Sequence, residues 1–423
     1  MKTKALLFKT GVAGVVKAAA AFISFIMAMA ITRFLGPEQA GLFLLALSIL
    51  SFFSVFLRLG LDNVIVKLIG GSNGSTYSIS ALTTGLVWSV LAALSITFLI
   101  YVGAQFLSVY VFAKPEFSNV LSIMILALPF MVIFMVLGYA FQAFYRVIAA
   151  TFFQNFGISF LFLLLLSFVY LFEGKQEFSA SYFAVCYLIA SIAVCSSALY
   201  LWNKQIKGAW RPIKFKDKDL WSSSSNLWVA STMNLTVQWA AILISGALLP
   251  ASDVAFLSVA LRTAMLASFV LTVVNMVVAP RYALLWKENK IEEIQNLAKW
   301  STRGMILLVL PIITVMVFFS DTIMGIFGDK FSDSGDLLAI IALGQFVAVA
   351  SGSVTYLLNM SGHERDFRKV TLFVGPITIL LSYIFISKWG VLGAAIATAV
   401  GLSLQNLGAL FMVRSRLGFW PIG

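Results

Sequence analysis

Apolar residues along this chain fall into long runs that are separated by short polar segments. Each run is close to or above the ~20 residues that a helix needs to cross the hydrocarbon of a bilayer. The pattern therefore predicts twelve membrane-spanning helices, near residues 11–35, 41–62, 80–112, 118–141, 148–172, 180–202, 222–249, 253–281, 303–320, 337–360, 370–387 and 391–413. Because most connections are short, neighbouring helices should be antiparallel hairpins.

Lysine and arginine in the connections predict the orientation of these helices. With the N-terminus on the cytoplasmic side, 23 of the 29 Lys and Arg residues fall on that side, 5 fall on the other, and Arg262 lies within a span. Cytoplasmic loops of membrane proteins carry such an excess of positive residues. We therefore expect both termini in the cytoplasm.

The composition supports a lipid environment. The chain is 61% hydrophobic and 11% charged, whereas a soluble domain carries about 25% charged residues. The net charge of +12 would suggest nucleic acid in a soluble protein. Here the cations lie between apolar runs, which excludes nucleic acid as a partner.

A basic connection divides the predicted helices into two sets of six. It implies an N-terminal six-helix bundle over residues 1–205, a cytoplasmic linker over 206–220 and a C-terminal six-helix bundle over 221–423. A shift of 213 residues aligns the Leu35–Glu38 turn with Leu248–Ala251, a faint sign of repetition between the halves. The second cytoplasmic connection, Trp286–Trp300, predicts an amphipathic surface helix.

Arg262 is the strongest candidate for a substrate-binding residue. It interrupts an apolar stretch from Val254 to Ala279 that carries no other charge. At about 1.5 Å per residue, it would lie roughly 12 Å from one end of a helix about 39 Å long. A cation at that depth should face a protein interior or a watery cavity. The guanidinium either anchors a phosphate or diphosphate there or bonds to backbone carbonyls and a helix end.

Polar residues on two further predicted helices extend this candidate site. Asn226, Asn234 and Gln238 lie within about a 120° arc of the seventh helix. Lys17 lies about a third of the way along the first, at a position that the 213-residue shift brings to the same region. Together they predict a cavity lined for sugar and anion. The alternatives are helix–helix hydrogen bonds for the stripe and snorkelling to the interface for Lys17.

Three residues near helix ends are candidates for gating or entry. Arg58 and Asp62 are spaced i, i+4, which puts them on one face of a helix. They form either an interfacial ion pair or an entry site for an anionic headgroup. Arg33, at the outer end of the first span, is a candidate exit-side contact.

Catalysis finds little support in the sequence. The single histidine, His363, lies in a loop, and the chain has no Cys/His metal spacing, no nucleotide-binding loop and no zinc-protease motif. We therefore expect no catalytic residue, no metal and no cofactor. The chain is not expected to be an enzyme.

Two segments of the first half resemble a known family. The sequence ITRFLGPEQAGLFLLALSILSFF (Ile31–Phe53) and the following RLGLDNVIVKLIGG (Arg58–Gly71) resemble the start of the Wzx-type polysaccharide flippases. These belong to the multidrug/oligosaccharidyl-lipid/polysaccharide (MOP) exporter superfamily. The resemblance implies an all-α membrane fold of two six-helix bundles around a central cavity, in which Arg262 and Lys17 match the family's cationic lining.

The resemblance also implies a function. Such proteins sit in the bacterial inner membrane and move undecaprenyl-diphosphate-linked oligosaccharide, most often the O-antigen unit of lipopolysaccharide, from the cytoplasmic to the periplasmic leaflet. A glycan polymerase and a chain-length regulator are the further partners to expect. The two bundles would rock in alternating access.

Two other functions remain open. A MATE-like cation-coupled exporter has the same helix number but uses acidic residues in the membrane, whereas the deep charge here is positive. A membrane glycan polymerase or acyltransferase usually carries a sizeable outward loop, and the outward loops here are short.

Overall fold

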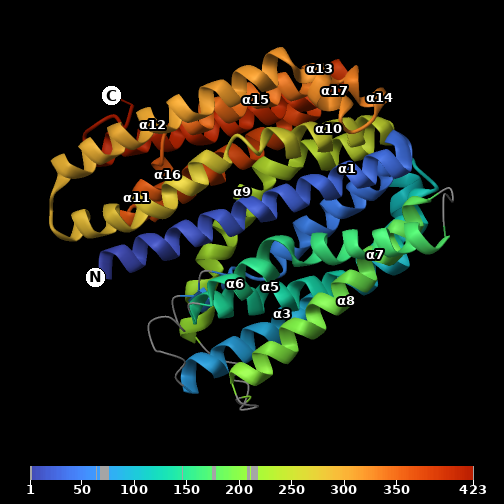
Figure 1. The fold of residues 1–423 in the computed structure, drawn as a ribbon, viewed down its shortest axis with the longest axis horizontal. Helices are drawn as coiled ribbons and strands as arrows, with labels where there is room; N and C mark the ends of the chain where they lie inside the picture. Colours follow the sequence, from blue (N-terminus) through green and yellow to red (C-terminus); the bar gives the residue numbers. More distant parts are fainter. Residues whose placement is uncertain are drawn as a thin grey trace. The chain divides into compact units, whose positions relative to one another are not determined.

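The computed structural model describes residues 2–62, 64–66, 76–144, 146–173, 178–206, 210 and 218–422, and this part of the chain is helical without a β-strand. The helices form two compact units (Figure 1). We call Val15–Leu235 the N-terminal unit, and Thr236–Gly423 together with Met1–Gly14 the C-terminal unit. The predicted bundle boundaries at 205 and 221 stay predictions.

The N-terminal unit contains most of α1 and the helices up to the first half of α9. Its elements are α1 (Lys2–Phe56), α3 (Thr76–Phe106), the π-helix η1 (Leu107–Val111), α4 (Phe117–Ile125), α5 (Leu128–Ala143), α6 (Val147–Thr151), the π-helix η2 (Phe152–Phe156), α7 (Gly157–Glu173), α8 (Ala180–Gln205) and α9 (Lys218–Leu248).

The C-terminal unit contains the rest of α9 and eight further helices. They are α10 (Ala251–Ala264), α11 (Phe269–Lys287), α12 (Ile291–Phe318), α13 (Ser320–Gly325), α14 (Asp329–Ser332), α15 (Gly335–Ala350), α16 (Val354–Met360) and α17 (Glu364–Leu417).

The predicted all-α membrane fold is confirmed. Within the described residues, eight helices are long and apolar enough to span a membrane, and α4 with α5 makes a ninth that is bent by 42°. Two of the long helices each hold two predicted runs, because α1 breaks at Gly36 (φ 69°) and α17 breaks at Gly390 (φ 59°). With α9, every one of the twelve predicted runs lies mainly in helix.

The Pro turn at the start of the second run is fixed by side-chain hydrogen bonds. The amide of Gln39 donates to Glu116 Oε2 (3.3 Å), and its carbonyl accepts from the backbone N–H of Ala180 (3.0 Å). Gln39 thus ties α1 to the starts of α4 and α8. Behind this turn, Phe43 stacks on Phe162 with ring centroids 5.8 Å apart, in the centre of the N-terminal unit.

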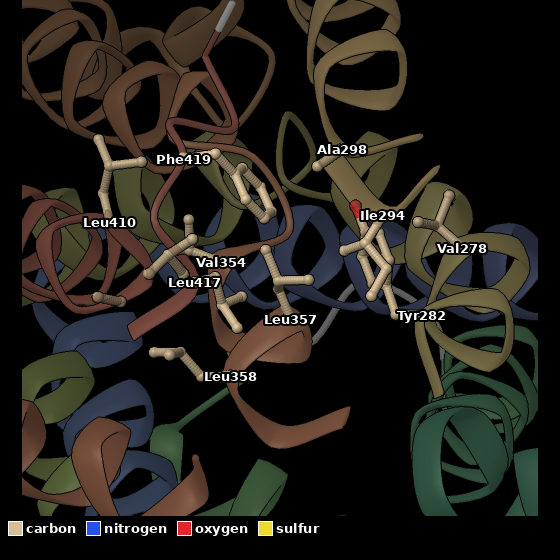
Figure 2. Close-up of a cluster of buried hydrophobic side chains, with 12 residues drawn as sticks. Val278, Tyr282, Ile294, Ala298, Val354, Leu357, Leu358, Leu410, Leu417 and Phe419 are labelled. Carbon is tan, nitrogen blue, oxygen red and sulfur yellow. The ribbon is translucent and has the colours of Figure 1, made fainter. Parts of the chain in front are cut away.

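Two apolar clusters fill the C-terminal unit. One joins the start of α12 to α16 and the end of α17, through Ile294, Ala298, Leu357 and Val413 (Figure 2). The other joins the turn between α10 and α11 to α12 and α15 through Ala267, Met305, Val309, Ala342 and Val349.

The predicted amphipathic surface helix is not a separate element. Its residues from Ile291 onward form the first turns of α12, and Ile294 and Ala298 are buried in the unit's own core. The apolar face therefore packs on protein rather than on the membrane surface.

Candidate functional site

The Arg58 turn, Leu57–Gly60, ends the second half of α1. Leu59 (φ 54°) and Gly60 (φ 74°) have left-handed backbone conformations, which stop the helix. The turn is closed by backbone bonds from the N–H of Arg58 to Val55 O (3.3 Å) and from the N–H of Leu61 to Arg58 O (2.9 Å). Arg58 therefore lies in a turn, not on the continuous helix that the sequence suggested.

The first half of α9 packs directly on this turn. Trp228 Nε1 donates to the carbonyl of Phe56 (2.8 Å), and the Ser224 hydroxyl donates to the carbonyl of Leu59. A Cβ at Gly60 would lie 2.5 Å from the Ser224 carbonyl oxygen. Only glycine allows the two backbones to approach so closely.

The predicted ion pair between Arg58 and Asp62 is present and buried. Arg58 Nη2 lies 3.2 Å from Asp62 Oδ2, and Arg58 is 5% exposed. The guanidinium carbon also lies 5.7 Å from the ring centroid of Tyr139 on α5. Asp62 lies beyond the end of α1, and burial raises the pKa of its carboxyl while the positive charge of Arg58 opposes that rise.

Each partner keeps hydrogen-bonding capacity beyond this pair. Arg58 Nε and Asp62 Oδ1 are buried and have no hydrogen-bond partner among the described protein atoms. A buried charged group with an unused donor is costly, since its lost solvation is not fully replaced. We call Arg58, Asp62, Tyr139, Ser224 and Trp228 the Arg58 cluster. It is suited chemically to receive a further anionic or polar group at Arg58.

Arg262 lies inside one candidate membrane span, Ala251–Lys287, as predicted, but close to an interruption of the helix that was not predicted. The apolar stretch is not one continuous helix, because α10 ends at Ala264 and α11 begins at Phe269. Residues between them form tight turns, with bonds from Leu266 N–H to Thr263 O (3.1 Å) and from Ser268 N–H to Met265 O (3.1 Å). Arg262 is half-buried in the last turn of α10, where a cation is favoured by the helix dipole.

The remaining predicted residues have varied positions. Asn234 and Gln238 lie half-buried on α9, and Arg33 is exposed three residues before the Gly36 break. The side chains of Lys17 and Asn226 lie outside the part of the chain that the structure describes, although their backbone is helical.

Sequence reasoning missed three residues of the Arg58 cluster, namely Tyr139, Ser224 and Trp228. Serines and aromatic residues are common along this chain, so their residue types did not mark these three as part of a site. Trp228 is 172 residues from its partner Phe56, so only the tertiary fold brings them together.

His363, the single histidine of the chain, packs against neighbouring side chains. His363 Nδ1 lies 3.0 Å from the Ser361 hydroxyl, and its ring meets Trp286 edge to face with centroids 5.7 Å apart. Among the described residues, no group of three or more His, Cys, Asp or Glu side chains is arranged to hold a metal ion.

Comparison with known families gives two matches. The sequence model of a family described as "Polysaccharide biosynthesis protein" matches residues 6–286, and that of the MatE family matches residues 228–384. The first match covers about two thirds of the chain, including the Arg58 turn and Arg262.

Two curated proteins are similar in sequence. A probable low-salt glycan biosynthesis flippase, Agl15 of Haloferax volcanii, is 27% identical over 194 residues, which are 45% of this chain and 40% of that protein. The matched stretch thus spans two fifths of that relative's length. An uncharacterized membrane protein of Methanocaldococcus jannaschii, MJ1068, is 24% identical over 394 residues, 86% of this chain and 75% of that protein.

Solved structures share the fold. A multidrug resistance MATE family transporter of the MOP superfamily, in an inward-facing conformation, has a TM-score of 0.76 at 15% identity and covers 96% of this chain and 98% of its own. The lipid II flippase MurJ, in an inward closed conformation, also has a TM-score of 0.76 at 15% identity, with 95% and 87% covered. At these identities the likeness concerns the fold alone.

Proposed function

The chain belongs to the polysaccharide biosynthesis protein family and to the MOP superfamily, and on that premise we propose that it is a flippase for lipid-linked oligosaccharide. The proposed cargo class is supported by the family description and by the similar Haloferax protein, which is named as a probable low-salt glycan biosynthesis flippase. The long apolar helices supply the multi-pass membrane location that such a cargo requires.

The observation that carries this proposal is the buried Arg58 cluster. A lipid-linked glycan joined through diphosphate presents an anion next to the membrane. Arginine suits that group because its planar fork donates two parallel hydrogen bonds to a phosphate. The Nε–H of Arg58 has no hydrogen-bond partner among the described residues. We propose that it donates to an oxygen of the diphosphate, and that the diphosphate displaces Asp62 from the guanidinium.

Arg262 in the C-terminal unit is a second candidate for phosphate binding. Arg58 lies in a break at the end of the second predicted helix of the N-terminal half, and Arg262 lies one turn before a break in the second predicted helix of the C-terminal half. We propose that Arg262 also binds phosphate. Lys17 and the Asn226, Asn234 and Gln238 stripe are the proposed contacts for the remaining charge and for the sugars.

The finer identity of the cargo is part of the proposal. The undecaprenyl-diphosphate-linked O-antigen unit of a bacterial inner membrane is one case, and both curated relatives named above are archaeal. We therefore base the proposal on the diphosphate-linked glycan rather than on one polyprenyl chain or one sugar.

The MatE match over residues 228–384 supports a second candidate, a cation-coupled exporter of small molecules. Such an exporter needs an acidic group within the membrane to bind its cation. In the Arg58 cluster the acid is already paired with an arginine at 3.2 Å. This pairing favours an anionic cargo over a cationic one.

A gene deletion with complementation separates the candidates. A flippase predicts that the deletion strain traps lipid-linked oligosaccharide on the cytoplasmic leaflet and lacks surface glycan, and that the wild-type gene restores both. As a matched control, Arg365→Gln, which alters an exposed arginine at the start of α17, should complement fully. Normal surface glycan with altered drug tolerance would contradict the proposal and favour the exporter. Units that reach the outer leaflet unpolymerised would point to a polymerase.

A further inference from the structure

Two arginine–tryptophan pairs lie on the surface of the C-terminal unit. The guanidinium carbon of Arg303 is 5.7 Å from the ring centroid of Trp300, and that of Arg414 is 5.9 Å from the ring centroid of Trp420. The two tryptophans are 71% and 44% exposed. Neither pair belongs to the Arg58 cluster or to the break after Arg262.

Both pairs belong to the same end of this unit. The start of α12 contributes Ile294 and Ala298 to the apolar cluster of Figure 2, and the end of α17 contributes Leu417, followed by Phe419. Trp300 and Arg303 follow Ala298 within two turns of α12. The pairs therefore flank one shared core.

The second pair is held by a folded segment that we call the α17 hook, Gly418–Ile422. Gly418 (φ 81°) ends α17 in a left-handed conformation, and its carbonyl accepts a hydrogen bond from Arg414. Phe419 is 4% exposed and points into the apolar cluster (Figure 2). Phe419 is buried, while Trp420 beside Arg414 and the following Ile422 are exposed.

Each arginine lies where an exposed apolar stripe ends. On α17 the exposed residues Leu404, Leu407 and Phe411 share a helix face with Arg414. On α12 the exposed residues Leu310 and Leu307 share a face with Arg303. At 100° per residue each set falls within an arc of about 80°. In a membrane, stripes of this kind would face the lipid tails, which would place the arginines at the depth of the headgroups.

The charge at this end is positive. Segments 281–303, 364–369 and 414–416 carry ten Lys and Arg residues and five Asp and Glu residues. Several of the acids are already engaged, since Asp366 accepts from Arg416 at 2.7 and 3.1 Å, and Glu288 and Glu293 pair with Lys290 at 3.1 and 3.3 Å. The excess of positive charge at this end favours an anionic partner.

We propose that the Arg303–Trp300 and Arg414–Trp420 pairs bind the headgroups of anionic phospholipids in the layer around the C-terminal unit. The indole rings lie at the interface, where tryptophan is favoured, and the guanidinium groups donate to lipid phosphates. Each arginine continues into an exposed apolar stripe on its helix. Because such a stripe can contact acyl chains, it favours a membrane lipid over a free phosphate as the ligand. This proposal requires only that the chain spans a membrane and does not depend on the proposed cargo.

Native mass spectrometry of the full chain tests the proposal. The protein is taken from bilayers of equal parts phosphatidylglycerol and phosphatidylcholine, and the retained lipids of each type are counted. A cation at the membrane surface contributes about 1 kcal/mol to binding of anionic lipid, so each arginine that is replaced should weaken the phosphatidylglycerol preference about five-fold. The double variant Arg303→Gln, Arg414→Gln should lose most of it.

Two further variants make the outcome specific. Arg303→Lys with Arg414→Lys keeps both charges and should keep most of the preference. Lys388→Gln, which alters an exposed cation two residues before the Gly390 break of α17, should leave the preference unchanged. Should the double variant misfold, the single Arg303→Gln gives the same test on α12 alone. An unchanged preference in the glutamine variants, or an equal loss in Lys388→Gln, would overturn the proposal.

Discussion

Arg58 is buried, and its Nε has no hydrogen-bond partner among the described residues. The proposed binding of diphosphate depends on this residue. Removing one partner of a buried ion pair leaves a lone charge and costs about 3–5 kcal/mol, whereas replacing both partners by apolar side chains is often neutral. We therefore expect Arg58→Gln alone to lower thermal stability strongly. The double variant Arg58→Met, Asp62→Leu should fold but fail to transport.

Thermal unfolding in detergent, together with a transport assay on the same preparations, checks both expectations. Wild-type transport by the folded double variant would remove Arg58 from the proposed site. Instability of the double variant as large as that of Arg58→Gln would instead mean that the charges are needed for folding.

Arg262 gives a second prediction at this scale. Arg262→Ala should abolish glycan export while the protein still accumulates in the membrane. Arg262→Lys should restore part of it, about 10- to 100-fold below wild type, because an ammonium lacks the paired donors of the guanidinium and a charged hydrogen bond contributes about 1.5–3 kcal/mol. Surface glycan and membrane protein level are measured in one complemented strain. Equal export by the alanine variant would exclude a central role.

Residue-level prediction succeeded where the partners are close in sequence. The i, i+4 spacing of Arg58 and Asp62 predicted an ion pair, which the structure has at 3.2 Å. The same reasoning missed Tyr139, Ser224 and Trp228, because contacts between helices far apart in the chain produce no spacing pattern in the sequence. The roles of Arg262, Arg33, Lys17 and the α9 stripe stay predictions.

At the scale of elements, the contact of α9 with the Arg58 turn explains how one helix holds the site. Gly60→Ala should destabilise the protein by about 1–3 kcal/mol, because the position has φ 74° and the new Cβ would lie 2.5 Å from the Ser224 carbonyl. Gly103→Ala is the matched control, since nothing lies within 4 Å of a Cβ there. Comparable melting temperatures for the two variants would show that the close approach is not required.

A second close approach joins α15 to α17. A Cβ at Gly344 would lie 2.6 Å from the Cα of Ala399, so Gly344→Ala should force the helices apart at a cost of about 1–3 kcal/mol. Gly304→Ala on α12, with open space around its Cβ, should be neutral or slightly stabilising. Chemical or thermal unfolding measures the stability of both variants. A Gly344→Ala variant more stable than wild type would contradict the close approach of α15 and α17.

Helix breaks could be predicted from the sequence only where glycine or proline marks them. Gly36 and Pro37 mark a break in α1, and the sequence predicted a turn there. The break at Met265–Ser268 contains neither glycine nor proline, so the apolar pattern predicted a continuous helix. Tertiary packing of Ala267 against α12 and α15 accompanies this break, and such packing is not visible in a single sequence.

At the scale of the whole molecule, the twelve apolar runs were enough to predict the fold class. In hydrocarbon every backbone polar group must be hydrogen-bonded within the protein, and a single apolar run of about 20 residues can achieve this only as a helix. Long apolar runs therefore predict membrane helices well. The substrate is harder, because it depends on a few buried contacts within that fold. The family match and the Arg58 cluster therefore contribute independent support for a glycan flippase.

The most direct measurement is transport by the purified protein in proteoliposomes. Diphosphate-linked oligosaccharide is placed in both leaflets, and its exposure to an impermeant glycan-modifying enzyme is followed over time. We expect wild-type protein to make nearly all of the lipid-linked glycan accessible. The folded double variant Arg58→Met, Asp62→Leu and the single variant Arg262→Ala should leave the glycan of the inner leaflet protected. A protected inner half with wild-type protein, or equal exposure with the variants, would contradict the account.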